Sequence, residues 1–127
     1  MSTESLWGNL EDLEEPRSPK SLLEEQAKEL RLATRGILRG EVKSNTFLGD
    51  FELEFDIIAP RINDYRYQVL KIRYGLDFYP AVINFTENGV IRSVDVADET
   101  ELKQTIKRIF QADSTRNAII ALKAQSK

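Results

Sequence analysis

Histidine and cysteine are both absent from this chain of 127 residues. Histidine is the only side chain whose ordinary pKa lies near neutral pH, so the usual general base, proton shuttle and metal ligand are missing. Without cysteine there is no thiolate nucleophile, iron–sulfur cluster, thiolate-bound zinc or disulfide. These two absences exclude most small catalytic sites and weigh against an enzyme, because any catalysis would fall to Asp, Glu, Lys, Tyr, Ser and Arg.

The sequence also lacks long apolar runs and the pattern of a secretory signal. Its longest hydrophobic stretches are only a few residues, too short to cross a bilayer. The first residues carry no basic region followed by an apolar stretch. We therefore expect a cytoplasmic protein that does not bind a membrane.

Negative charge is concentrated at the N-terminus. The net charge of −3 is the balance of −5 on the first 16 residues, which have no Lys or Arg, and +2 on the rest. The body has no basic excess of the kind that binds nucleic acid, so a nucleic-acid partner is not expected. The acidic segment is interpreted either as a solubilising tail or as a partner-binding segment.

Residues 1–17 are predicted to form an acidic leader with a short amphipathic segment. Its large apolar side chains are Leu6, Trp7, Leu10 and Leu13. They recur at spacings of three and four, so a short helix would place them on one face. Because a large apolar surface is rarely left exposed on a monomer, we expect the leader to fold back onto the body. The alternative is a helix that docks in a groove of a protein partner with a basic surface, or of a second copy in a homodimer.

Residues 18–127 are predicted to form one domain. Ser18 followed by Pro19 is a good helix start, and Gly36 is a plausible helix end. Apolar and acidic residues alternate strictly over 51–57, which is typical of an antiparallel strand with one buried face. Asn88-Gly89 lies between two strand-like runs and indicates a hairpin. The strands are expected at 37–43, 51–57, 65–74, 80–86 and 90–96, followed by helices beginning after Asp98 and at Asp113.

This order of elements predicts an α+β fold. We expect a single domain with an antiparallel sheet of four to five strands, and an N-terminal helix and two C-terminal helices packed on one face. In the strand at 65–74, strict alternation places large apolar residues on both faces of the sheet. Leu70 and Ile72 share one face while Tyr67 and Val69 take the other, which indicates either a β-bulge or burial on both faces.

A row of carboxylates lies on the polar side of the strand at 51–57. Glu52, Glu54 and Asp56 stand about 6.6–7 Å apart along such a strand, and two of them with water could hold Mg²⁺ in a metal-dependent hydrolase or nuclease. The favoured interpretation is an ordinary solvated face, with ion pairs to a neighbouring strand. The basic residues available there are Arg66, Lys71 and Arg73.

Aromatic and basic residues mix in the next strand. Tyr65, Arg66 and Tyr67 are candidates for stacking single-stranded nucleic-acid bases or a small ligand on the sheet. Ordinary cross-strand packing is favoured, because the acidic row would share that face and repel phosphates.

In size, charge and order of elements the chain is similar to small acidic bacterial accessory proteins, such as immunity proteins and secretion chaperones. No motif carries this likeness, and it assigns no residues. The sequence therefore predicts a non-enzymatic protein-interaction module of the inhibitor, immunity or accessory-subunit type, without a cofactor. Its leader supplies the partner-binding side chains. The alternatives are a metal-dependent hydrolase or nuclease and a nucleic-acid- or ligand-binding sheet.

Overall fold

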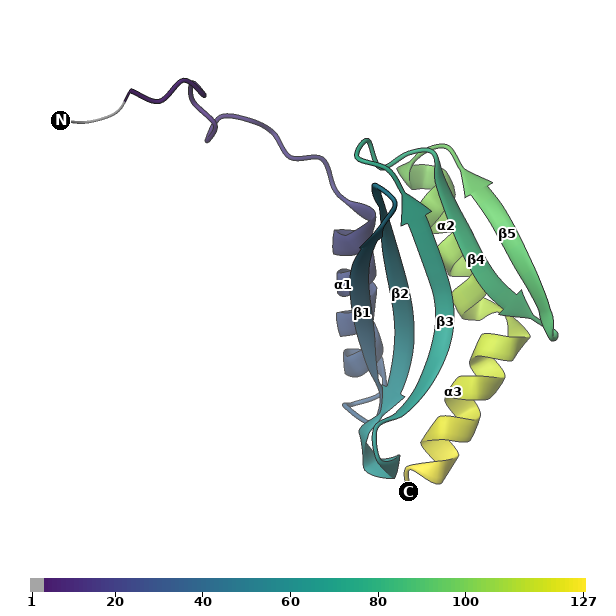
Figure 1. The fold of residues 1–127 in the computed structure, drawn as a ribbon. Helices are drawn as coiled ribbons and strands as arrows, with labels where there is room; N and C mark the ends of the chain where they lie inside the picture. Colours follow the sequence, from purple (N-terminus) through teal and green to yellow (C-terminus); the bar gives the residue numbers. More distant parts are fainter. Residues whose placement is uncertain (1–3) are drawn as a thin grey trace.

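The computed structural model describes residues 4–127, which form one five-stranded sheet and three α-helices (Figure 1). The elements are α1 (Pro19–Ala33), β1 (Arg39–Phe47), β2 (Asp50–Ala59), a 3-10 turn η1 (Pro60–Ile62), β3 (Tyr65–Tyr74), β4 (Ala81–Glu87), β5 (Val90–Val96), α2 (Glu99–Gln111) and α3 (Asp113–Gln125). The predicted α+β class, the antiparallel sheet and the positions of the three helices in the chain are confirmed. Among these elements, no helix has the length and apolar character needed to cross a bilayer.

The sheet is a simple meander. Its strands lie side by side in chain order, and every neighbouring pair is antiparallel. The turn between β4 and β5 is the predicted one, with Asn88 and Gly89 both at positive φ, 52° and 79°. A second tight turn at Leu48-Gly49 joins β1 to β2, so β1 extends four residues beyond the predicted 37–43 strand. Pairing with β2 holds this polar stretch extended, although its own strand propensity is low.

A β-bulge in β3 explains why its apolar residues do not alternate regularly. Leu70 pairs with Phe55 whereas Gln68 pairs with Asp56, so Val69 is the extra residue. The bulge places Tyr67 on the same face as Leu70, where it packs against the core.

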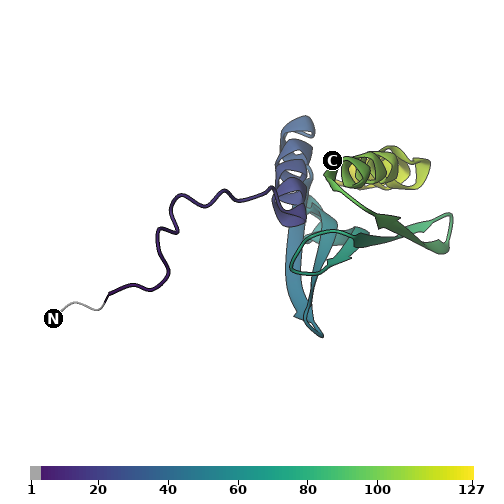
Figure 2. The same ribbon diagram turned by 90° about the horizontal axis from the view of Figure 1, so that it is seen from above.

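One buried cluster joins the three helices to the apolar face of the sheet. It includes Leu23 of α1, Phe55 of β2, Leu70 of β3 and Leu102 of α2, all 2 % exposed or less. The helices therefore lie on one face, as predicted, and the other face of the sheet is left without a helix (Figure 2).

Helix α1 lies very close to β1 at Gly40. A Cβ added to Gly40 would lie 2.6 Å from the Cα atom of Ala27 and 2.9 Å from the ring of Phe55. No side chain fits in this space. Glycine has a low strand propensity, but at this position its lack of a side chain allows α1 to pack against β1.

The leader does not behave as expected. Residues 4–17 contain no helix or strand and extend away from the domain (Figures 1 and 2). The expected fold-back is therefore not what the structure shows, and no helix gathers the four apolar side chains on one face. The physical reason is local. An isolated helix of about 12 residues is marginal in water, and this one would contain Gly8 and be stopped by Pro16. Residues 1–3 of the predicted leader lie outside the described residues.

Candidate protein-interaction site

The leader carries four of the exposed large apolar side chains of the described residues, close together in the sequence. The exposed fractions are 92 % for Leu6, 79 % for Trp7, 54 % for Leu10 and 64 % for Leu13. None of the four belongs to the core of residues 4–127 or packs against it. The candidate partner-binding side chains are therefore accessible, and the domain's core is complete without them.

Contacts between the leader and the domain are made by Arg17, and Ser18 begins the domain. The Ser18 hydroxyl caps α1 by accepting a hydrogen bond from the backbone N–H of Ser21 at 3.1 Å. The Arg17 guanidinium pairs with Glu25 of α1 and lies 3.8 Å from the carboxylate of Glu99 at the start of α2. These contacts hold the base of the leader beside the two helices.

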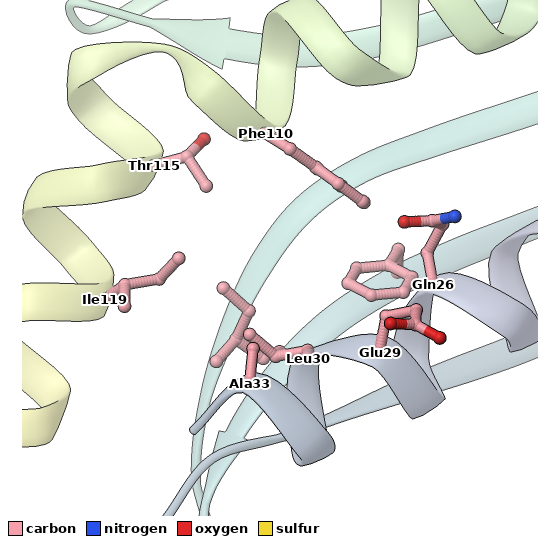
Figure 3. Close-up of a pocket in the computed structure, with 9 residues that line it drawn as sticks. Gln26, Glu29, Leu30, Ala33, Phe110, Thr115 and Ile119 are labelled. Atoms are coloured by element: carbon pink, nitrogen blue, oxygen red, sulfur yellow. The ribbon is translucent and has the colours of Figure 1, made fainter. Parts of the chain in front are cut away.

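A groove runs between α1 and the α2–α3 pair, and we call it the interhelix groove. Its apolar end is a cavity of about 210 Å³ whose lining from the sheet is Phe55 and Ile57 of β2. Figure 3 shows the side chains that line it from the helices. Leu30 and Ala33 of α1 lie on one wall, and Phe110 of α2 lies on the other. The remaining residues that line this end are Gln26, Glu29, Thr115 and Ile119.

The basic end of the interhelix groove adjoins the apolar end, because Gln26 and Phe110 line both. It is a second cavity of about 310 Å³ whose charged lining residues are Arg17, Lys103 and Lys107. Its apolar lining comes from Leu22 of α1 and Ile106 of α2, together with Phe110. The interhelix groove therefore changes from basic to apolar along its length.

The open face of the sheet carries the predicted acidic row as a ladder of ion pairs. Lys71 lies 3.8 Å from Glu52 and 3.9 Å from Glu54, and Arg73 lies 3.4 Å from Glu52. Within residues 4–127 no group of three or more acidic side chains is arranged to hold a metal ion. These contacts match the favoured interpretation of cross-strand pairing, and they surround the carboxylates with ammonium and guanidinium groups.

Asp56 departs from the expected solvated row because it is fully buried. Its Oδ2 accepts a hydrogen bond from Arg66 at 2.8 Å and lies 3.7 Å from the Lys43 ammonium, while its Oδ1 has no hydrogen-bond partner among the described residues. Arg66 also binds Glu41 at 3.2 Å. Burial, and then the neighbouring Asp56, raise the pKa of Glu54, while Lys43 and Lys71 act in the opposite direction.

The three residues suggested for base stacking do not form one surface. Tyr67 lies on the helix-covered face and packs against the core, whereas Arg66 lies on the open face and is occupied by two carboxylates. Tyr65 is 55 % exposed at the start of β3. The bulge at Val69 separates this end of β3 from the ladder, and no aromatic platform results.

The interhelix groove was not anticipated from the sequence. Leu30, Ala33, Phe110 and Ile119 all fall in apolar stripes that predict core positions. The spacing of apolar residues within one helix does not give the distance between two helices. The gap between α1 and α3 is therefore visible only in the folded chain. The stretch of basic residues in α2 is the one signal that could have pointed to a charged rim.

Comparison of the chain with protein-family models, with curated proteins and with solved structures gives no match.

Proposed function

We propose that the protein is a non-enzymatic protein-interaction module whose leader binds a protein partner. The observation that carries this proposal is the exposure of four large apolar side chains on a segment that the domain does not need for its core. On a helix the four would form one contiguous apolar surface, and such a surface on a monomer marks an interaction site. The lack of histidine and cysteine favours binding over catalysis, and an inhibitor, immunity or accessory-subunit role in the cytoplasm fits a chain of this type.

The proposed mode of recognition is a helix that forms on binding. Leu6, Leu10 and Leu13 would share one face of that helix, with Trp7 beside them. The indole of Trp7 is the expected anchor, because tryptophan is enriched among the residues that dominate interface energies. The acidic residues that follow would face a basic rim on the partner, so association should slow as salt concentration rises. They are Glu11, Asp12, Glu14 and Glu15.

The test is capture of the partner from an extract of the native host by the immobilised full chain. Trp7→Ala is expected to weaken binding at least about 30-fold, the loss typical of a hot-spot residue. The matched control is Leu76→Ala, because Leu76 is 80 % exposed and Trp7 is 79 % exposed, yet Leu76 lies between β3 and β4. Equal capture by the wild type and Trp7→Ala would reduce the leader to a solubilising tail and end the proposal.

A further inference from the structure

Resting on the proposed function, we infer that the leader's partner is a second copy of this chain, whose interhelix groove receives it. Two copies would exchange leaders reciprocally, each leader closing the groove of the other copy. Such an exchange gives a two-fold dimer in which the same surfaces meet twice.

The order of apolar and acidic residues in the leader matches the order of the apolar and basic ends of the interhelix groove. Leu6 and Trp7 come first and the acidic cluster at 11–15 follows. In the groove, the cavity against Leu30 and Phe55 is apolar, and the cavity beside Lys103 and Lys107 is basic. A leader lying antiparallel to α1 would place its apolar start in the apolar end and its acidic cluster in the basic end.

The basic end retains charge for this contact. Lys107 forms no ion pair with any residue of 4–127, and Lys103 makes a single pair, 3.7 Å from Glu99. Arg17 is already held by Glu25 and Glu99. We therefore assign the main attraction for the acidic cluster to Lys107 and Lys103, which lie one turn apart on α2.

The lengths agree as well. A helix over residues 4–15 would be about 18 Å long, and the 15 residues of α1 span about 22 Å. A leader helix would therefore run beside α1 for most of its length. Leu6, Leu10 and Leu13 would face the groove together, and burial there would supply the packing that the isolated segment lacks.

The path of the chain favours the second copy over the leader's own domain. In both ribbon views the leader leaves α1 on the side away from α2 and α3 (Figures 1 and 2). Glu15 and Ser18 each precede a proline, which disfavours helical backbone at these two residues, and Ser18 is extended at φ −81° and ψ 156°. Docking in its own groove would require the chain to reverse within these residues, whereas exchange leaves them extended.

The contact area suits a stable dimer. Reciprocal exchange buries eight large apolar side chains from the two leaders, and an aromatic side chain alone buries about 150–250 Å². With the groove surface that they cover, this approaches the roughly 1,200–2,000 Å² of stable protein–protein interfaces.

The first test uses Trp7, which is the only tryptophan in the sequence. Sedimentation velocity and tryptophan emission are measured on the full chain from micromolar to near-millimolar concentration. We expect a shift from monomer to dimer, with Trp7 emission moving to shorter wavelength over the same range. A blue-shifted monomer at every concentration would mean docking in the leader's own groove and would overturn the inference.

The second test is a mixing experiment. Leu10→Asn disables the leader, and Ala33→Arg fills the apolar end of the groove from an exposed helical position. Each variant alone should dimerise at least about 30-fold more weakly, and an equimolar mixture should form heterodimers through the one intact leader and the one intact groove. Leu48→Asn is the matched control, since Leu48 is 90 % exposed in the β1–β2 turn, and it should dimerise like the wild type.

The two proposals fail in different ways. If the wild type stays monomeric with an exposed Trp7, while Trp7→Ala still abolishes capture of a host protein, this inference is wrong and the proposed function stands. If dimers form but Leu10→Asn and Ala33→Arg leave them unchanged, the exchange is also wrong. If Trp7→Ala alters neither dimerisation nor capture, both proposals fall.

Discussion

The leader and the domain use the same kinds of residues in opposite ways. Leu23 of α1 is fully buried in the core, whereas Leu10 of the leader is 54 % exposed and touches none of that core. Both are leucines at helical spacing in the sequence, yet only one has a sheet to pack against. The difference teaches that the apolar side chains of the leader, unlike those of the domain, do not contribute to the core of residues 4–127. Apolar surface in the domain stabilises the fold, and apolar surface in the leader is available for a partner.

The largest contrast should come from one substitution made in both regions. Leu23→Ala is expected to lower the free energy of unfolding by about 2–5 kcal/mol, because it opens a cavity in the core. Leu10→Ala should change it by less than about 0.5 kcal/mol, as is usual for an exposed site. Urea unfolding of dilute samples followed by circular dichroism measures both. A loss above 1 kcal/mol for Leu10→Ala would show that the leader belongs to the folded core.

The close approach of α1 to β1 gives a second contrast within the domain. Gly40→Ala should destabilise the protein by about 1–3 kcal/mol, because its Cβ meets the backbone of Ala27. Gly75→Ala is the control, since the nearest atom to its added Cβ lies 3.8 Å away and its φ is not positive. Thermal unfolding of the two variants should therefore separate them clearly, and equal melting temperatures would contradict this packing.

The open face of the sheet provides a third comparison, between an ion pair whose carboxylate is buried and one whose carboxylate is partly exposed. Arg66→Ala removes the hydrogen bond to buried Asp56 and should cost about 1–3 kcal/mol. Arg73→Ala breaks an exposed pair with Glu52 and should cost no more than about 1 kcal/mol. Urea unfolding at moderate salt compares the free energies of unfolding of the two variants. A larger loss for Arg73→Ala would show that the burial of Asp56 does not make its ion pair the more stabilising one.

Glu54 should give a smaller effect that depends on pH. Its pKa is raised in the folded protein, mainly by burial, so ionised Glu54 opposes folding. Its favourable contribution is present below about pH 4 and is lost as pH rises through the raised pKa. Glu54→Gln should therefore stabilise the protein at neutral pH relative to wild type, with the advantage shrinking as pH falls. An advantage that grows toward low pH would contradict the sign.

Local chemistry made much of the domain predictable from the sequence. Asp98 and Glu101 form the expected capping pair, with the Glu101 N–H donating to Asp98 at 2.9 Å and the Ala97 N–H donating to the Glu101 carboxylate at 2.7 Å. The Asn88-Gly89 turn and the strand at 51–57 followed from spacing alone, and the bulge in β3 was one of the two arrangements that the spacing left open. Each of these features depends on a few residues that are close in sequence.

Features that depend on distant packing were not predictable in this way. The need for Gly40 arises from Ala27 on another element, and the burial of Asp56 arises from Lys43 and Arg66 on two neighbouring strands. The interhelix groove is set by the distance between α1 and α3. For the leader, spacing groups the four apolar side chains. It does not show whether the segment folds back onto the domain, because that depends on surfaces outside the segment.

The most direct test of the separation between leader and domain is the emission of Trp7 during unfolding. The full chain is unfolded in urea at the lowest concentration that circular dichroism allows, and the emission wavelength and acrylamide quenching of Trp7 are recorded on the same samples. We expect both to match a water-exposed indole throughout, with no step where the helix signal is lost. A red shift and a rise in quenching at the unfolding midpoint would show that Trp7 packs on the folded monomer, and would contradict the account.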